Sequence, residues 1–524
     1  AGSAGCVLAN RLTENGRYSV LLLEAGGHDR NFKIWMPIGY GMAFYDKRIN
    51  WMYTSEPDPN TDNRVSYWPR GKVIGGSSAI NAMIYMRGQA ADYDGWRQRG
   101  LAGWGWDDVL PLFLAQEDHI APVGDHHRSG GEWRVEHPRM RWGVLDAFSA
   151  AAETVGIPVV ADFNGGDNEG VGYFQVNQKA GRRWSAARGF LKPVLTRPNL
   201  KLVTGAQVSR VIIEEGRAVG VAWTQGGEAF EARADGEVVL AAGAVGTPQI
   251  LELSGIGDGG RLSVLGVETA RHLPGVGENL QDHLQIRPYY GVTGVPTMNE
   301  LYASWWRRPL MAAEYALFRK GPMSMAPSQL GAFARSSPEQ ATPNLQFHVQ
   351  PLSLERFGEA LHVAPAITVS VCNLRPASRG SIHAASADPR EAPLIQPNYL
   401  STAEDERVAV DAMRLVREIV AQPPLARFSP VERRPGAEAQ SDDELLAAAR
   451  TLGTTIFHPV GTAKMGLESD SGAVVDARLR VHGVRALRIA DASVMPTITS
   501  GNTNSPTMMI AEKAARMMVE DGRG

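Results

Sequence analysis

The chain has 524 residues, with 53 Lys and Arg against 56 Asp and Glu and a formal net charge of -3. This balance excludes a protein whose main task is to bind nucleic acid, because such a protein needs a basic face for the phosphates. Hydrophobic residues make up 44% of the chain, which excludes a mainly disordered protein, since so much apolar surface can be buried in folded domains.

The first residues indicate part of a dinucleotide-binding unit. Small and apolar residues at helical spacing end at Asn15-Gly16, and Ser19–Leu23 is typical of a buried parallel strand. Gly2 and Gly5 fit the second and third glycines of G-x-G-x-x-G. Glu24 stands nineteen residues after Gly5, near the place of the acid that binds ribose. The alternative is a Gly- and Ala-rich helix start that binds no ligand.

The strand and the first glycine of this pattern are missing before Ala1. We therefore expect an apolar strand and a glycine to precede Ala1 in a longer chain, so the given sequence leaves open whether there is a targeting signal.

Two segments in the middle of the chain carry further cofactor signals. Gly75-Gly76-Ser77-Ser78, with Asn81 behind it, suits a cofactor that lies flush against the backbone, or else a flexible loop before a packed helix. Residues 237–242 predict a strand. Thr247-Pro248 then predicts the start of a helix, where the missing N–H of proline is harmless.

The C-terminal region contains the strongest candidate for catalysis. Twelve histidines are present, and we expect most of them to have no catalytic role; His126-His127, in a loop with Gly and Asp, is expected to be solvated. His458 precedes a proline, and by position alone it is compatible with an ordinary loop residue. A predicted strand at 487–490 ends at Asp491-Ala492, and ligands bind at the carboxyl ends of such strands. A polar loop with Asn502 then leads into a last helix, predicted over 507–518.

Residues 70–94 and 243–257 resemble the two signature patterns of the glucose–methanol–choline (GMC) oxidoreductase family, and the N-terminal and C-terminal segments fit the same family. The resemblance extends to roughly Val519. It implies an α/β fold with a discontinuous, doubly wound, Rossmann-like FAD-binding domain and an α+β substrate domain with an antiparallel sheet. Residues 1–289 would be mainly FAD-binding with part of the substrate cap, residues 290–450 mainly substrate-binding, and residues 451–524 would return to the FAD domain.

The resemblance also implies a reaction: FAD-dependent oxidation of a primary alcohol to the aldehyde, as in choline dehydrogenase-like enzymes. His458 would be the base, flavin N5 would take the hydride, and Asn502, forty-four residues on, would hold the oxygen, with Asn504 as the competing assignment. Some members attach FAD covalently through a His in the first signature region. Residues 70–94 contain no His, and Ile80 stands near that place, so we expect non-covalent FAD.

Further cofactor contacts follow from the resemblance. They are Gly2, Ser3, Ala4 and Gly5 near the pyrophosphate, Glu24 near the ribose, Asn81, Ala82, Met83 and Ile84 flanking the isoalloxazine, Val208 with its backbone at adenine, Asp491, Ala492, Asn502 and Thr503 at the flavin end, and Ala25, Gly75 and Phe457 elsewhere on the cofactor. The sequence has neither an H-E-x-x-H motif nor a Cys pair at ligand spacing, so we expect no metal.

The substrate is less defined. Residues 323–330 contain no carboxylate, which disfavours choline because a quaternary ammonium needs an anionic or aromatic cage. Phe457 beside His458 favours a benzylic, furanic or aliphatic primary alcohol. Oxygen and a quinone-type or dye-type molecule both remain open as electron acceptor. The alternative function is that of a flavin-bound lyase or decarboxylase on the same fold.

Location is the last expectation. No apolar run of about 18 residues is present, so we expect no transmembrane helix. Cys6 and Cys372 are too few for a disulfide scaffold, so we expect a reducing, cytoplasmic compartment, with peripheral membrane association as an alternative. Residues 305–308, Trp-Trp-Arg-Arg, suit either a membrane-surface patch or a packed cap helix, and the packed helix is the favoured interpretation.

Overall fold

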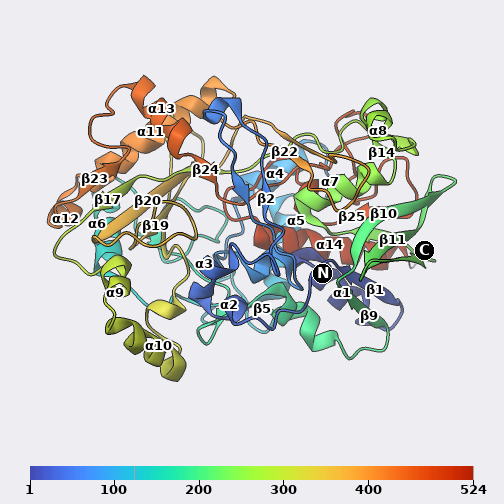
Figure 1. The fold of residues 1–524 in the computed structure, drawn as a ribbon, viewed down its shortest axis with the longest axis horizontal. Helices are drawn as coiled ribbons and strands as arrows, with labels where there is room; N and C mark the ends of the chain where they lie inside the picture. The colour runs from blue at the N-terminus through green and yellow to red at the C-terminus, as the bar shows by residue number, and fades with distance from the viewer. Residues whose placement is uncertain (123, 523–524) are drawn as a thin grey trace.

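Segments from both ends of the chain build one half of the molecule (Figure 1). The computed structural model describes residues 1–122 and 124–522. Helix α1 (Ser3–Leu12) packs on the last helix, α14 (Asn504–Asp521). Two bonds join these helices: Ser3 Oγ donates to Asn504 Oδ1 at 2.8 Å, and Arg11 Nε donates to Glu512 Oε2 at 2.7 Å. The predicted helix and strand at the start of the chain are both confirmed.

Parallel strands follow α1 in this half. Strand β1 (Val20–Glu24) pairs with β9 (Leu200–Thr204), and β13 (Val238–Leu240) pairs with β25 (Leu487–Ile489). Within the described residues β1 and β13 have no other strand partner, so the parallel layer consists of two separate pairs. An antiparallel sheet of β10 (Gln207–Glu214), β11 (Arg217–Gln225) and β12 (Glu228–Arg233) lies beside them.

Helix α7 (Gly243–Leu253) begins earlier than the sequence predicts. Pro248 lies inside the helix and cannot donate to the carbonyl of Ala244 four residues before it. The hydroxyl of Thr462 donates to that carbonyl instead, at 2.7 Å. The Thr462 hydroxyl, distant in sequence, thus satisfies the carbonyl that Pro248 leaves without a donor. Pro248 can therefore lie inside the helix, although local rules would place a proline in the first turn.

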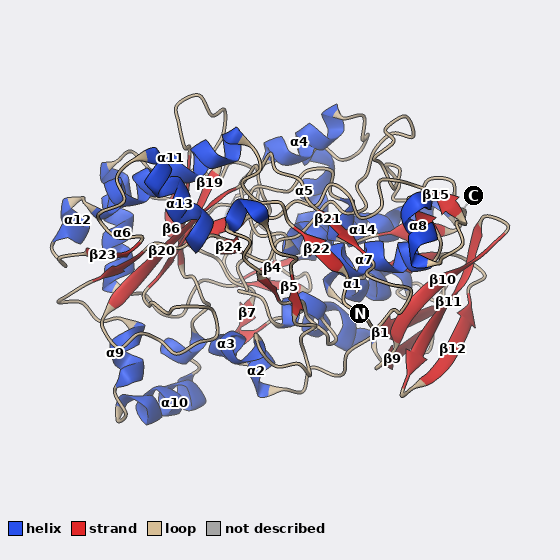
Figure 2. Ribbon diagram, turned by 45° about the horizontal axis from the view of Figure 1, so that its top comes forward, coloured by secondary structure: helices blue, strands red, loops and turns tan. Residues whose placement is uncertain are grey.

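An antiparallel sheet of eight strands forms the other half of the molecule (Figure 2). Its order is β23 (Val431–Arg434), β17 (Tyr289–Gly291), β20 (Ala366–Asn373), β19 (Leu345–Gln350), β18 (Leu330–Ala334) and β6 (Gly170–Tyr173), with β16 (Leu284–Ile286) and β24 (Thr454–Thr455) attached. The strands predicted at 345–350 and 366–371 are confirmed. The division into regions 1–289, 290–450 and 451–524 stays a prediction.

Strand β19 divides its side chains between the two faces of this sheet. Leu345, Phe347 and Val349 pack in one apolar core with α6 (Gly143–Thr154) and α11 (Ala403–Val420). The residues between them, Gln346, His348 and Gln350, are also buried but belong to the opposite face, because side chains alternate along a strand. This alternation gives β19 one apolar side and one polar side.

Helices α9 (Met298–Ala303) and α10 (Arg307–Phe318) project from the edge of the molecule in Figures 1 and 2. Trp305 and Trp306 between them are 81% and 50% exposed. The expectation of a packed cap helix is therefore wrong for these residues. In the part of the chain that the structure describes, no helix combines the length and the apolar character needed to cross a bilayer.

The remaining elements lie in both halves and between them (Figure 1). The helices are α2 (Phe32–Trp35), α3 (Tyr40–Ala43), α4 (Ala90–Gln98), α5 (Trp106–Gln116), α8 (Gly259–Leu265), α12 (Pro423–Ala426) and α13 (Asp442–Leu452). The short strand pairs are β2 (Tyr53–Thr54) with β3 (Tyr67–Trp68), β4 (Glu117–His119) with β5 (Trp133–Val135), β7 (Gln178–Lys179) with β8 (Arg182–Arg183), β14 (Ile256–Gly257) with β15 (Arg271–His272), and β21 (Ser381–His383) with β22 (Leu394–Gln396).

Candidate active site

A cavity of about 1190 Å³ lies between the two halves and also extends between β1 and β13. It collects residues from both ends of the chain and from the middle. Of the residues that the sequence assigns to catalysis or cofactor binding, those lining it are Gly2, Ser3, Ala4, Gly5, Glu24, Ala25, Asn81, Ala82, Met83, Ile84, Val208, Phe457, His458, Asp491, Ala492, Asn502 and Thr503. Gly75 is not among the lining residues, and its neighbours Gly76 and Ser77 are.

The N-terminus of α1 forms one end of the cavity and suits a dinucleotide pyrophosphate. Gly2 is extended, and no side chain caps the first N–H groups of the helix. Gly76 has φ of 52°, and a Cβ there would lie 2.7 Å from Cα of Gly2. Backbone segments therefore meet closely, and free N–H groups at a helix N-terminus attract an anion.

Glu24 ends β1 at the cavity wall. Its carboxylate accepts the N–H of Gly26 at 2.8 Å. This bond holds the carboxylate at the carboxyl end of a parallel strand, which is where an acid meets the ribose of a dinucleotide.

The backbone around His458 is fixed by polar contacts. The N–H of His458 donates to Asp282 Oδ1 at 2.8 Å, and the N–H of Phe457 donates to Thr455 Oγ1 at 2.7 Å. Arg70 donates to the carbonyl of Phe457 at 2.7 Å. Phe457 itself has φ of 71°, a strained value for a bulky residue, and these bonds hold it there.

A chain of hydrogen bonds determines which nitrogen of His458 carries a proton. His283 Nε2 lies 3.2 Å from the carbonyl of Leu374, which can only accept, so this nitrogen donates. In the neutral ring, His283 Nδ1 is then an acceptor. It lies 3.0 Å from His458 Nδ1, which must therefore carry the proton. The lone pair of His458 is left on Nε2.

Asn502 faces that lone pair. Its Nδ2 lies 3.0 Å from His458 Nε2, and its Oδ1 accepts from Gln346 Nε2 at 3.2 Å. The second bond orients the amide so that an N–H points toward His458. Asn504, the competing assignment, is bonded to Ser3 instead.

The loop that carries Asn502 is held by Asp92 of α4. The N–H and the hydroxyl of Ser500 each donate to the Asp92 carboxylate at 2.7 Å, and Asn168 donates to the Ser500 carbonyl at 3.0 Å. These contacts place Asn502 on a rigid support although it lies in a loop.

Burial lowers the proton affinity of the histidines of this site. It lowers the pKa of His458 well below its ordinary value, and the nearby His283, His348 and Arg70 lower it further. Burial likewise lowers the pKa of His283 to about 4 and, with the influence of His283, that of His348 to about 3. At neutral pH all three imidazoles are therefore neutral.

The wall opposite the predicted cofactor residues is polar and aromatic. His348 and Gln350 of β19 line the cavity, and neither nitrogen of His348 has a hydrogen-bond partner in the structure. The rings of Phe44 and Phe357 lie 5.1 Å and 5.8 Å from the ring of Phe457. Among the described lining residues, the carboxylates belong to the cofactor half: Glu24, Asp235, Glu237, Asp491 and Asp521.

Sequence reasoning missed several residues of this site. His283 and Asp282 lie in the polar run 281–283 between two leucines, a weak signal among twelve histidines. Gln346 and His348 alternate with apolar residues along a predicted strand. That pattern is typical of a strand with one solvated face, and it does not reveal that the polar face lines a cavity.

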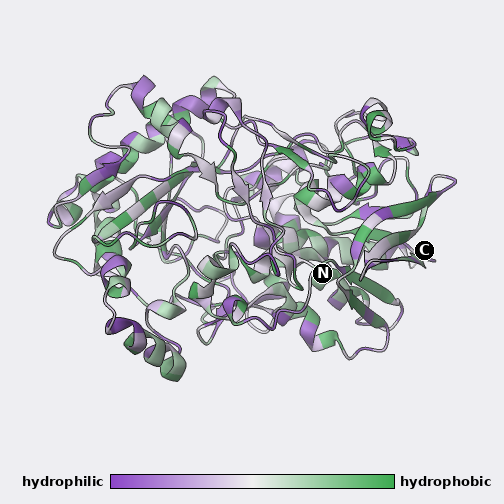
Figure 3. Ribbon diagram, viewed as in Figure 1, coloured by the Kyte–Doolittle hydropathy of each residue, from purple (hydrophilic) through white to green (hydrophobic). Residues whose placement is uncertain are grey.

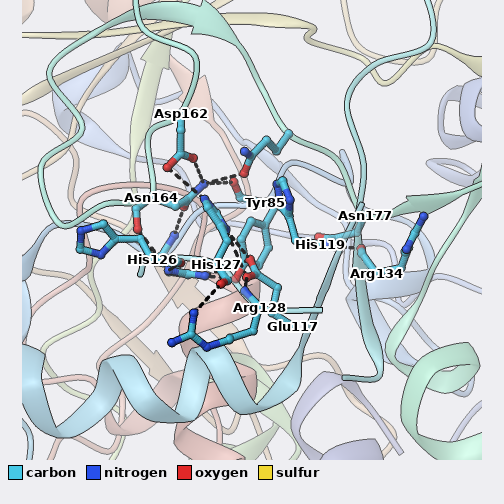
Figure 4. A network of polar contacts seen from close by, with 12 residues as sticks. Tyr85, Glu117, His119, His126, His127, Arg128, Arg134, Asp162, Asn164 and Asn177 are labelled. Atoms are coloured by element: carbon cyan, nitrogen blue, oxygen red, sulfur yellow. Dashed lines mark hydrogen bonds and ion pairs between the residues drawn. The ribbon is translucent and has the colours of Figure 1, made fainter. Parts of the chain in front are cut away.

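A second histidine cluster lies outside the cavity (Figure 4). His127 Nδ1 lies 3.0 Å from Glu117, and Nε2 lies 3.1 Å from Asp162. Glu117 also pairs with Arg87 at 2.9 Å, with both side chains fully buried. Burial opposes the charge of His127, but the bonds to Asp162 and Glu117 raise its pKa to about 9. The expectation of a solvated His127 is therefore wrong, whereas His126 is exposed.

Comparison with known protein families gives the context for the cavity. The N-terminal and C-terminal models of GMC oxidoreductases match residues 1–285 and 376–511. The chain belongs to the GMC oxidoreductase family. It is an enzyme that acts on CH–OH donors.

Similar proteins agree with this assignment. The alcohol dehydrogenase [acceptor] of Pseudomonas putida is 41% identical, over 99% of this chain and 94% of that protein. The mitochondrial choline dehydrogenase of Mus musculus is 42% identical, over 98% and 87%. An FAD-dependent oxidoreductase from Chaetomium thermophilum has a similar structure, with a TM-score of 0.91 and 28% identity over 100% of this chain and 98% of that one. Together they support a flavoenzyme that oxidises alcohols with FAD, and lend no support to a lyase or decarboxylase.

Proposed function

We propose that this GMC oxidoreductase oxidises a primary alcohol to the aldehyde, with Nε2 of His458 as the base. The observation that carries the proposal is the hydrogen-bond chain from the Leu374 carbonyl through His283 to His458, which leaves the Nε2 lone pair beside Asn502 at the cavity wall. A base must be unprotonated to work, and the low pKa of His458 keeps it so at neutral pH.

Two groups would hold the alcohol. The hydroxyl donates to His458 Nε2, while its oxygen accepts an N–H from Asn502, which cannot act as a competing base. As the proton moves to Nε2, the negative charge that develops on the oxygen is stabilised by the Asn502 N–H and by Arg70 nearby. FAD, when bound, would accept the hydride from the same carbon.

FAD is proposed to be held without a covalent bond. Residues 70–94 contain no His, and Ile80 lines the cavity in this region. Precipitation with acid or heat should therefore leave the flavin in a yellow supernatant. Yellow colour in the washed pellet, with a peptide whose mass is increased by that of FAD, would refute this proposal.

The substrate is proposed to be neutral rather than a quaternary ammonium. Gln285 lines the substrate side, and the described lining residues of that side include no carboxylate to balance a fixed positive charge. Phe357 offers an aromatic ring, but the buried guanidinium of Arg287 already lies 3.7 Å from its centroid and would repel a second cation. Benzylic, furanic and aliphatic primary alcohols fit the aromatic wall.

Anaerobic reduction of the bound flavin tests the reaction and its substrate together. Benzyl alcohol, furfuryl alcohol, hexan-1-ol and choline would each be added to the FAD-loaded protein, and the loss of absorbance near 450 nm followed in time. We expect rapid bleaching with neutral alcohols and much slower bleaching with choline. No bleaching with any alcohol would refute the function, and faster bleaching with choline would refute the substrate class.

A further inference from the structure

We propose that α10 and the residues just before it dock onto the surface of a lipid bilayer with anionic headgroups. The apolar stripe on this helix consists of Trp306, Leu310, Ala313 and Leu317, at positions i, i+4, i+7 and i+11. Residues at this spacing lie on one face of a helix. The proposal does not depend on the reaction assigned above, and it concerns the edge of the molecule that projects in Figure 2.

The side on which α10 contacts the body of the protein leaves this stripe exposed to solvent. Within the helix only Met311 and Tyr315, one turn apart, are buried, and the Tyr315 hydroxyl donates to the carbonyl of Gly181 at 3.0 Å. At 100° per residue these two positions lie on the side of the helix opposite the stripe. The body of the protein therefore holds α10 from behind and presents the stripe outward.

The exposed apolar side chains are large and adjacent. Leu310, Leu317 and Phe318 are 59%, 73% and 63% exposed, and Trp305 and Trp306 precede them. Figure 3 shows hydrophobic residues toward the end of α10 although the helix projects from the body. Single exposed apolar residues are common, but a cluster of this kind marks an interaction site. Tryptophan in particular favours the interface between water and lipid.

The positive charge around the stripe favours a partner with negative charge. Residues 298–320 contain Arg307, Arg308, Arg319 and Lys320 against Glu300 and Glu314, a net charge of +2, whereas the whole chain carries -3. In the adjoining segment 178–192 no residue is acidic, and Lys179, Arg182 and Arg188 are at least partly exposed, whereas Arg183 is buried and Lys192 pairs with Asp29. Anionic headgroups complement this surface, while a second copy of the chain would bring the same positive charge against it.

The two neighbouring segments form one surface. Arg182 of β8 and Arg319 after α10 lie 5.2 Å and 6.0 Å from the ring centroid of Trp35, so they share one aromatic partner. In Figures 1 and 2, α2 and α3 lie along the same edge as α10. Phe44, next to the end of α3, lines the cavity. Docking would therefore bring this side of the cavity close to lipid, from which an apolar alcohol or a lipid-soluble electron acceptor could enter.

Flotation with vesicles tests the proposal on the full FAD-loaded chain. Vesicles of phosphatidylcholine alone would be compared with vesicles that also contain phosphatidylglycerol, at low and high salt. We expect binding to the phosphatidylglycerol vesicles that weakens with salt. The stripe variant Trp306→Gln/Leu310→Gln/Leu317→Gln should bind at least about 10-fold more weakly, because three apolar side chains no longer enter the interface.

Two further variants make the result specific. Val264→Gln changes a side chain that is 89% exposed on α8, far from α10 in Figure 1, and should bind like the parent protein. Arg307→Gln/Arg308→Gln should lose about 10-fold in binding to phosphatidylglycerol vesicles while any binding to phosphatidylcholine is unchanged. Flavin absorbance and circular dichroism establish that each variant is folded, so turnover is not needed as a readout.

Three outcomes would overturn the proposal. One is a parent protein that stays unbound with phosphatidylglycerol vesicles at low salt. Another is a stripe variant that floats as well as the parent. The third is a dimer in sedimentation velocity that the stripe variant converts to a monomer, since the stripe would then be covered by a second copy of this chain.

Discussion

Two buried histidines in this molecule have opposite surroundings and, we infer, opposite uses. His127 lies between the carboxylates of Glu117 and Asp162, and its pKa is raised to about 9. His458 lies between the imidazole of His283 and the amide of Asn502, and its pKa is lowered well below the ordinary value. The comparison shows that burial alone does not determine the charge of a histidine. The partners on its two nitrogens do, and of these two rings only the neutral one at the cavity has a lone pair that can take a proton.

The sharpest test of this contrast is to remove each ring. His458→Ala should lower turnover by about 10²–10⁴-fold, the usual loss for a general base, while the flavin content stays the same. His127→Gln should keep turnover within about 2-fold when it is assayed well below its melting temperature, since His127 does not line the cavity. Steady-state kinetics with the 450 nm to 280 nm absorbance ratio would measure both. Near-normal turnover of His458→Ala would remove the proposed role.

Loss of the charge beside His127 should be costly for stability. Glu117→Gln leaves Arg87 and His127 buried without their shared carboxylate, and we expect the free energy of unfolding to fall by about 3–5 kcal/mol. Glu214→Gln is the matched control, because it breaks an ion pair with Arg233 in which both side chains are more than half exposed. That change should stay below about 1 kcal/mol. Denaturant titrations that gave equal losses would show that the buried network is not a stabilising unit.

The pH dependence of stability should show both kinds of histidine. His283, His348 and His458 have pKa values below 6.5 in the folded state, so only the unfolded chain takes up their protons as the pH falls from about 6.5 toward 4. Each should then lower the free energy of unfolding by about 1.4 kcal/mol per pH unit. His127 acts in the other direction: its contribution to the free energy of unfolding is complete below about pH 6.5 and is lost as the pH rises through 9.

Denaturant midpoints at several pH values test both expectations. A plot of midpoint against pH should have a flatter acid limb for His348→Gln and a flatter alkaline limb for His127→Gln. Unchanged limbs would contradict these protonation states.

The smallest expected effect concerns the orientation of His458. His283→Leu removes the acceptor for the Nδ1 proton and should lower kcat about 10-fold with little change in KM, because the base is less well oriented. His283→Gln places an amide oxygen within reach of that proton and should recover part of the loss. If leucine and glutamine are equally impaired, packing rather than the hydrogen bond is the reason.

Local patterns in the sequence predicted local structure well. The alternation at 345–350 and the apolar run at 19–23 gave the strands β19 and β1, since such patterns depend only on neighbouring residues. The start of α7 was mispredicted because Thr462, more than 200 residues away, takes the place of the missing proline N–H. His127 was mispredicted for the same reason: its partners Glu117 and Asp162 come from segments on either side of its loop.

The candidate site shows the same limit. Motifs singled out His458 and Asn502, and the structure places their side chains 3.0 Å apart. No local pattern distinguishes His283 from the other histidines, because its importance comes from the residue it meets 175 positions away. The roles of these residues remain proposals that the variants above can decide.

The contact between α1 and α14 has a consequence for how the protein is made. Ser3 and Asn504 are bonded across 501 positions, and both line the cavity. A ribosome that adds about 5–20 residues per second needs about 25–100 s to travel that distance. During this time the glycine-rich end of α1 exists without the helix that covers it. The wall of the cavity to which both helices contribute is therefore complete only after nearly the whole chain has been synthesised.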